Sequence, residues 1–219
     1  NYGNSNFDVR NAVKGSVVYQ LPFGHGRRFL NNNFLLDELV GGWQASGTVV
    51  AQSGQPFTVT MNTDNSYSLG NTASNPSKWY PNVVGNPRIS NHGAKHGTNQ
   101  WFNEAAFAAP TPGTFGNSGR NSLTGPGLTN VNFSLGKAFA IWEQVHLQIR
   151  ADANNVLNHP SFNLPNSALI VCSNTTTAGC ANASPEAIAA GTAVATGSSS
   201  ITGVTVGGRT MQLGARLTF

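Results

Sequence analysis

The stretch RTMQLGARLTF, residues 209–219, decides the fold class of this chain. Apolar side chains take every second position, at Met211, Leu213, Ala215, Leu217 and Phe219, and polar or small residues lie between them. A two-residue period of this kind is typical of a β-strand with one apolar and one polar face. The sequence therefore predicts a final strand that closes on an aromatic residue of its apolar face.

Four earlier segments show the same period. In QVHLQIRADAN, residues 144–154, valine, leucine, isoleucine and alanine alternate with glutamine, histidine, arginine and aspartate. Such alternation over about ten residues favours half-buried strands over helices. We expect five long strands, each antiparallel to the next, near residues 7–21, 42–60, 128–139, 144–157 and 209–219.

Composition excludes several classes of protein. Charged residues make up only 9% of the chain, against about 25% in ordinary soluble domains. The net charge is +4, but the 12 lysines and arginines are scattered, so we expect no nucleic-acid partner, which usually requires a basic stripe. No run of about eighteen apolar residues is present to form a transmembrane helix, although a membrane barrel crosses with much shorter alternating segments.

The connections between the expected strands differ greatly in length. Pro22–Gly42 and Ile141–Glu143 are the shorter connections, whereas residues 61–127 and 158–208 are long and rich in Asn, Gly, Ser or Thr. In an up-and-down meander every second connection lies on the same side, so both long loops fall on one side. Short turns on one side and long loops on the other are typical of outer-membrane barrels, whose long loops are extracellular.

The apolar faces of the expected strands are rich in small residues. Gly15, Ala45, Gly47, Ala151 and Ala153 lie at positions where a soluble core would need bulk, because protein interiors are close-packed. Lipid chains conform to such a surface. The fold class predicted is therefore all-β: an antiparallel up-and-down meander of about five long strands that forms part of a transmembrane β-barrel.

Several motifs, in order along the chain, resemble a known family. They are YQLPFGHGRRF, GGWQASGTVVAQSGQPFT, WFNEAAFAAP, GTFGNSGRNSLTGPGLTNVNFSLGKAF, IRADANNVLNHPSFNLP and RTMQLGARLTF. Together they resemble the C-terminal barrel region of TonB-dependent outer-membrane receptors, in the Oar-like group with a carboxypeptidase-regulatory-like domain. The resemblance covers nearly the whole chain and is weakest in residues 172–208. One departure is Asn11, where the family pattern leads us to expect histidine.

The resemblance implies a barrel of twenty-two strands, a plug in its lumen and energy-coupled uptake of a ligand, with carbohydrate and peptide as candidates. Five strands are too few to close a barrel, since the smallest membrane barrels have eight, so we expect the last quarter of one. The implied location is the bacterial outer membrane. The implied partners are outer-membrane lipid, the plug and other strands of the same protein, the TonB complex and the barrel-assembly machinery. We expect no enzymatic activity and no cofactor.

The candidate site residues fall into three sets. The polar candidates expected to face the barrel lumen are Asp8, Arg10, Lys14, Gln44, His146, Arg150, Asp152 and Arg216. The aromatic candidates for ligand contact in the extracellular loops are Trp79, Tyr80, Trp101, Phe102 and Phe107, with the alternative that they hold the loop together or lie in an interfacial belt. The resemblance implies that the terminal alternation, carried by Met211, Leu213, Leu217 and Phe219, is the signal for barrel assembly.

Two remaining features leave alternatives open. Cys172 and Cys180 lie eight residues apart in a polar segment, which favours a local disulfide over two free thiols. His92 and His96 have a spacing that suits a metal only on a helix, and the glycines around them favour a loop, so we expect no metal. Two other functions stay open at this point: a surface adhesion or structural barrel without transport, and a secreted carbohydrate-binding β-sandwich.

Overall fold

The computed structural model describes residues 3–23, 41–62, 79–89, 100–142, 144–197 and 199–219. The chain divides into two compact units. The first, which we call the strand unit, contains Arg10–Ser53, Gly127–Ser161 and Val204–Phe219. The second, which we call the loop unit, contains Asn1–Val9, Gly54–Pro126 and Phe162–Gly203.

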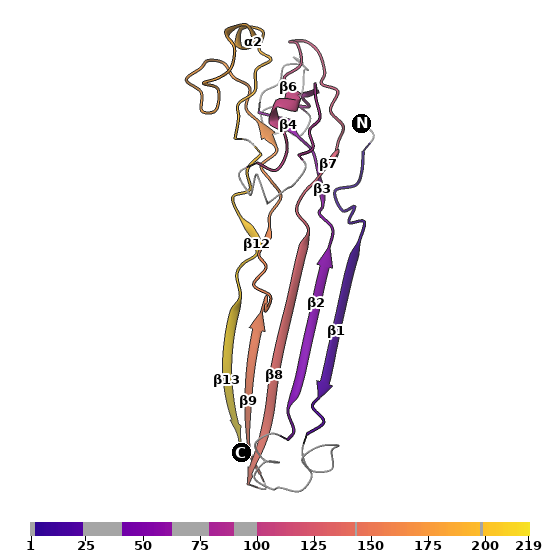
Figure 1. Cartoon of the computed structure of the whole chain (residues 1–219), viewed down its shortest axis with the longest axis vertical. Helices are drawn as coiled ribbons and strands as arrows, with labels where there is room; N and C mark the ends of the chain where they lie inside the picture. Colours follow the sequence, from indigo (N-terminus) through magenta and orange to yellow (C-terminus); the bar gives the residue numbers. More distant parts are fainter. Residues whose placement is uncertain (1–2, 24–40, 63–78, 90–99, 143, 198) are drawn as a thin grey trace. The chain divides into compact units, whose positions relative to one another are not determined.

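The strand unit is one five-stranded antiparallel sheet (Figure 1). Its strands lie side by side in the order β1, β2, β8, β9, β13. Their bounds are Ala12–Gln20, Gln44–Gln52, Leu128–Trp142, Val145–Asn154 and Thr210–Thr218. The meander predicted from the alternating segments is therefore confirmed, since each long strand pairs antiparallel with the next one along the chain.

The register gathers most apolar residues of the five strands on one face. Across the sheet, Val17 pairs with Gly47, Gly47 with Phe133 and Phe133 with Ala153, and Met211 pairs with Ala153 on the far side. This face is open: Met211 is 73% exposed and Leu213 is 80% exposed. A continuous exposed apolar surface of this extent marks an interaction site rather than a protein core.

Both edges of the sheet lack a neighbour within the described part of the chain. There, β1 pairs only with β2, and β13 pairs only with β9. An edge strand presents a row of unpaired N–H and C=O groups that template pairing with another strand. The sheet is therefore built to continue on both sides.

The first expected strand begins later than the sequence predicted. It was expected from residue 7, but β1 begins at Ala12. The Asp8 N–H donates to the Ser5 carbonyl at 3.1 Å and the Val9 N–H donates to the Phe7 carbonyl at 2.9 Å. These tight turns use the backbone groups that a ladder would need, so Asp8 and Arg10 precede the strand.

The second expected strand ends earlier than predicted. It was expected to run to residue 60, but β2 ends at Gln52, and β3 (Pro56–Phe57) pairs elsewhere, with β7 (Leu123–Thr124). Between the two strands, the backbone at Gly54 approaches the Gly125 carbonyl so closely that a Cβ atom would lie 1.8 Å from the oxygen. Only glycine permits this approach, and the chain leaves the long ladder there.

The two long connections form a folded unit rather than separate loops. Short ladders join them: β4 (Thr60–Met61) pairs parallel with β11 (Ala168–Leu169), and β5 (Asn82–Val83) pairs antiparallel with β6 (Phe107–Ala108). The unit also contains the 3-10 helix η2 (Glu104–Ala106) and α2 (Pro185–Ala189). The short strands β10 (Ser161–Phe162) and β12 (Val204–Val206) lie where the chain passes between the units.

The loop unit has its own apolar core. Phe57, Val59, Phe102, Phe107 and Leu169 are each at most 5% exposed and pack together. Because these residues come from both connections, residues 61–127 and 158–208 stabilise each other. The sequence indicated only that they would be long.

Candidate functional site

A charged network occupies the polar face of the sheet, on β8 and β9. The Arg150 Nε donates to the Asp152 carboxylate at 2.8 Å. The Ser134 hydroxyl donates to the same carboxylate oxygen, and the Arg150 Nη2 reaches the Ser134 oxygen at 3.5 Å. The three side chains therefore hold one another in a fixed arrangement on the face opposite to the apolar residues.

Glycines lie opposite Arg150 on both neighbouring strands. In register, Arg150 pairs with Gly136 on β8 and with Gly214 on β13. A Cβ atom at Gly136 would lie 4.0 Å from the Arg150 Cγ, and a Cβ atom at Gly214 would meet nothing within 4 Å. The Arg150 side chain is 59% exposed, so its guanidinium keeps free donors for a further partner.

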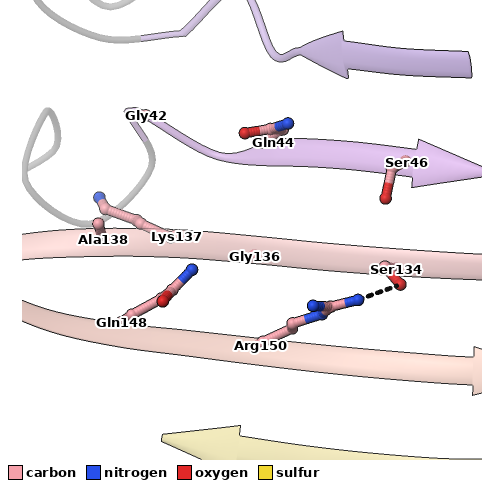
Figure 2. A pocket seen from close by; sticks show the side chains of 9 residues that line it. All are labelled: Gly42, Gln44, Ser46, Ser134, Gly136, Lys137, Ala138, Gln148 and Arg150. Atoms are coloured by element: carbon pink, nitrogen blue, oxygen red, sulfur yellow. Dashed lines mark hydrogen bonds between the residues drawn. The ribbon is translucent and has the colours of Figure 1, made fainter. Parts of the chain in front are cut away.

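A shallow cavity of about 300 Å³ adjoins this network (Figure 2). Gln44 and Ser46 line it from β2, and Gln148 and Arg150 line it from β9. Figure 2 shows the side chains of Gln148 and Arg150 reaching from β9 towards β8. Most of the lining groups are amides, hydroxyls and cations, which suit a polar neutral or anionic partner.

The network lacks the geometry of a Ser-His-Asp triad. In that triad a histidine lies between the serine and the acid, whereas Ser134 bonds directly to Asp152. His146 lies on the same strand six residues from Asp152, which is about 20 Å along an extended chain. The arrangement can bind and orient a partner, but it does not activate the Ser134 hydroxyl.

The other polar candidates are distributed along the same face. Lys14 pairs with Val50, Arg216 pairs with Gln148, and His146 pairs with Thr218. Asp8 and Arg10 were expected on the polar face of the first strand. This prediction is wrong, because both residues precede β1, which begins at Ala12. The sheet thus brings together Gln44, Arg150 and Asp152 and leaves Lys14 on the opposite edge strand from Arg216.

Four polar residues of the site were missed among the predicted residues. Ser46, Ser134, Lys137 and Gln148 line the cavity together with Arg150. Ser46, Ser134 and Gln148 occupy polar positions of the alternating segments. Aligning residues 128–139 with residues 144–157 across their short connection would have placed Ser134 opposite Asp152, as the register shows.

The loop aromatics lie mostly inside the loop unit. Phe102 is 1% exposed and packs against Phe57, with ring centroids 5.9 Å apart, and against Phe107 in an edge-on contact at 5.8 Å. Trp79 and Phe107 are also buried. This burial favours the alternative that these rings hold the loops together. Tyr80 and Trp101 are partly exposed.

Cys172 and Cys180 are joined by a disulfide, with their Cα atoms 5.8 Å apart. Both are buried, beside Ala193 and Ala195. The alternative of two free thiols is therefore wrong. The bridge ties together a turn of the loop unit.

His92 and His96 lie outside the described residues. Within the part that the structure describes, no three histidine, cysteine, aspartate or glutamate side chains cluster as metal ligands would. No helix in the described ranges is both long enough and apolar enough to cross a membrane.

Comparison with known proteins identifies the family. No curated protein matches the chain, and no solved structure matches it. A family profile described as outer membrane beta barrel domain matches residues 1–212. This assignment contradicts the secreted soluble β-sandwich, and it accounts for the open apolar face, which meets lipid. The chain belongs to the outer membrane beta barrel domain family and is located in the bacterial outer membrane.

Proposed function

We propose that the chain is the C-terminal part of the barrel of a TonB-dependent receptor of the Oar-like group, which imports a ligand with energy delivered from the inner membrane. The sequence motifs from residue 19 to residue 219 support this proposal by resemblance. The closed barrel would have twenty-two strands, with β13 as its last. Carbohydrate and peptide are the candidate ligands.

One observation carries the proposal: a sheet with two open edges has a largely apolar face on one side, exposed at Met211 and Leu213, and a charged network on the other. In a bilayer the apolar face meets lipid, and the polar face then lines a wet lumen. Lys14, Gln44, His146, Arg150, Asp152 and Arg216 are the residues we place in that lumen. Their partners there are the plug of the same protein and the ligand in transit.

The topology gives the proposal an orientation. The connections from β2 to β8 and from β9 to β13 both leave the same end of the sheet and carry the loop unit. We place that unit on the extracellular side, because outer-membrane barrels carry their long loops there. The opposite end, with Phe219, then faces the periplasm, where Met211, Leu213, Leu217 and Phe219 serve the barrel-assembly machinery.

The proposed work involves no covalent step and no cofactor. The loop unit captures a ligand, the TonB complex acts on the plug, and the plug rearranges to open a path through the lumen. The network fits this role because its hydroxyl, carboxylate and guanidinium groups exchange hydrogen bonds with a partner without forming a covalent bond.

An uptake experiment tests the proposal. Labelled oligosaccharides and labelled peptides are supplied to three kinds of cells: wild type, cells without this protein and cells without the inner-membrane energy transducer. We expect accumulation of at least one label to be lost in both mutant strains. Accumulation that persists without the transducer contradicts energy coupling. An unchanged uptake in cells without the protein, together with loss of surface attachment, would identify the adhesion barrel instead.

A further inference from the structure

The loop unit contains a cavity of about 340 Å³ that is separate from the polar face of the sheet. Its lining comes from three segments and includes Arg88, Ile89, Trp101, Phe102, Leu123 and Thr124. The volume lies within the range of small-molecule sites, about 300–1,000 Å³. The cavity therefore has room for one small ligand.

Hydrogen bonds tie two sides of this cavity together. The Asn103 N–H donates to the Pro87 carbonyl at 2.9 Å, and the Asn103 Nδ2 donates to the Asn86 carbonyl at 3.3 Å. The Arg88 N–H donates to the Asn86 Oδ1 at 3.0 Å. The segment that carries Arg88 is thus held in place before any ligand arrives.

The apolar wall is equally well anchored. The Trp101 indole Nε1 donates to the Thr124 carbonyl at 3.0 Å, and the Trp101 backbone N–H donates to the Ser199 carbonyl at 3.0 Å. Leu123 belongs to the core of the loop unit. The indole is therefore held at one orientation against a buried floor, which lowers the entropy lost when a ring packs against it.

Arg88 adds the only cation among the lining side chains, and it is exposed. In the described part of the chain, no residue forms an ion pair or hydrogen bond with its guanidinium. The Glu104 carboxylate does not compete with a ligand for Arg88, because its oxygens already accept hydrogen bonds elsewhere. Glu104 is 4% exposed and accepts from the Gly197 and Ser199 N–H groups at 2.7 and 2.5 Å. Arg88 therefore offers an unsatisfied fork of donors at the cavity.

We propose that this cavity binds a small ring that bears a carboxylate, with the ring against Trp101, Ile89 and Leu123 and the carboxylate paired with the Arg88 guanidinium. Guanidinium–carboxylate pairs form two parallel hydrogen bonds, and a fixed indole packs against a ring face. Aromatic acids and uronic acid sugars both carry this chemistry. The inference rests on the proposed function in one respect: the cavity is the capture site if the loop unit faces outward.

Binding to the protein extracted from outer membranes in detergent tests the inference. Isothermal titration is carried out with benzoate and with glucuronate, and with benzamide and glucose as uncharged counterparts. We expect at least one carboxylated probe to bind more tightly than its counterpart. The Arg88→Gln substitution should weaken that binding about tenfold or more. The Arg120→Gln substitution removes the same charge from an exposed residue of the same unit and should leave binding unchanged.

The outcomes separate the ligand sources and the two hypotheses. Binding of benzoate alone assigns aromatic acids, and binding of glucuronate alone assigns uronic acids. Absence of binding for both probes, equal binding of the uncharged counterparts, or an Arg88→Gln variant equal to wild type overturns the inference. Titration does not depend on transport, so Arg88-dependent binding in a protein whose uptake needs no energy would leave this site intact and contradict only the proposed function.

Discussion

Asn155 closes the end of β9 with hydrogen bonds to three other segments. Its Nδ2 donates to the Gly207 carbonyl at 2.7 Å and to the His159 carbonyl at 3.1 Å, and its Oδ1 accepts from the His159 N–H at 3.1 Å. Its own N–H donates to the Asn132 Oδ1 at 3.0 Å. The residue is 2% exposed and has φ of 50°, a conformation that asparagine tolerates better than most residues.

Replacing Asn155 should destabilise the folded barrel. The Asn155→Ala substitution removes three side-chain hydrogen bonds of a buried residue, which we expect to lower the free energy of unfolding by about 2–4 kcal/mol. Urea unfolding of the refolded protein in lipid vesicles measures the change. The neighbouring Asn154→Ala substitution, at an exposed position, serves as the control. Equal midpoints for the two variants would contradict the role assigned to Asn155.

The role of Asn155 could not be predicted from the sequence. Its partners Asn132 and Gly207 lie 23 and 52 residues away, and no local pattern links such positions. Arg150 and Asp152 were predictable as members of a polar face, because alternation alone assigns the face. Their bond to Ser134 depends on the pairing register between two strands, which alternation does not give.

Among the elements, the long strands that have one exposed apolar face were the easiest to predict from the sequence. The strand expected at 144–157 is β9, Val145–Asn154, and the strand expected at 209–219 is β13, Thr210–Thr218. Their alternation is clean because each face meets one environment throughout. The short strands β3 and β4 contain two residues each, too few for any period, and were therefore absorbed into a single predicted strand.

A charge on the apolar face of β13 should be far more damaging than the same charge on its polar face. Leu213 lies near the middle of the strand and is 80% exposed, so in the membrane its side chain meets lipid. We expect Leu213→Lys to lower the free energy of unfolding by about 2–4 kcal/mol. The adjacent Gln212→Lys substitution, on the other face, should have little effect.

Heat-dependent migration of the folded barrel on gels and urea titration in vesicles report this difference. The two variants carry the same new charge one residue apart. Any general effect of that charge on expression is therefore the same in both, and it drops out when their stabilities are compared. A Gln212→Lys variant that is as unstable as Leu213→Lys would contradict the assignment of the two faces.

At the scale of the whole molecule, the two units obtain their stability in different ways. The loop unit has a buried core of aromatic and aliphatic side chains, including Phe102 and Leu169. The strand unit is a single sheet whose apolar side chains are largely exposed, as at Val17 and Leu217. An isolated sheet of this kind does not bury enough surface to be stable in water, so lipid on its apolar face and further strands at its edges must supply the rest.

The sequence predicted the meander of the strand unit and missed the loop unit. A meander is built from strands that are consecutive in the sheet, so the two-residue period of each strand and the alternation of shorter and longer connections suffice to infer it. The core of the loop unit joins residues far apart in the chain, as where Met61 pairs with Leu169. Such contacts carry no periodic signal, and the composition of these segments, rich in Asn, Gly, Ser and Thr, conceals the few apolar residues that hold them together.

The central claim is that the odd-numbered residues of β13 meet lipid and the even-numbered residues meet water. Single substitutions to cysteine at Met211, Gln212, Leu213, Gly214, Ala215 and Arg216 test it in outer membranes, where the native cysteines are bonded to each other. Reaction with a membrane-impermeant maleimide should be fast at Gln212, Gly214 and Arg216 and slow at Met211, Leu213 and Ala215. Labelling that shows no two-residue alternation, or alternation of the opposite phase, would contradict the account.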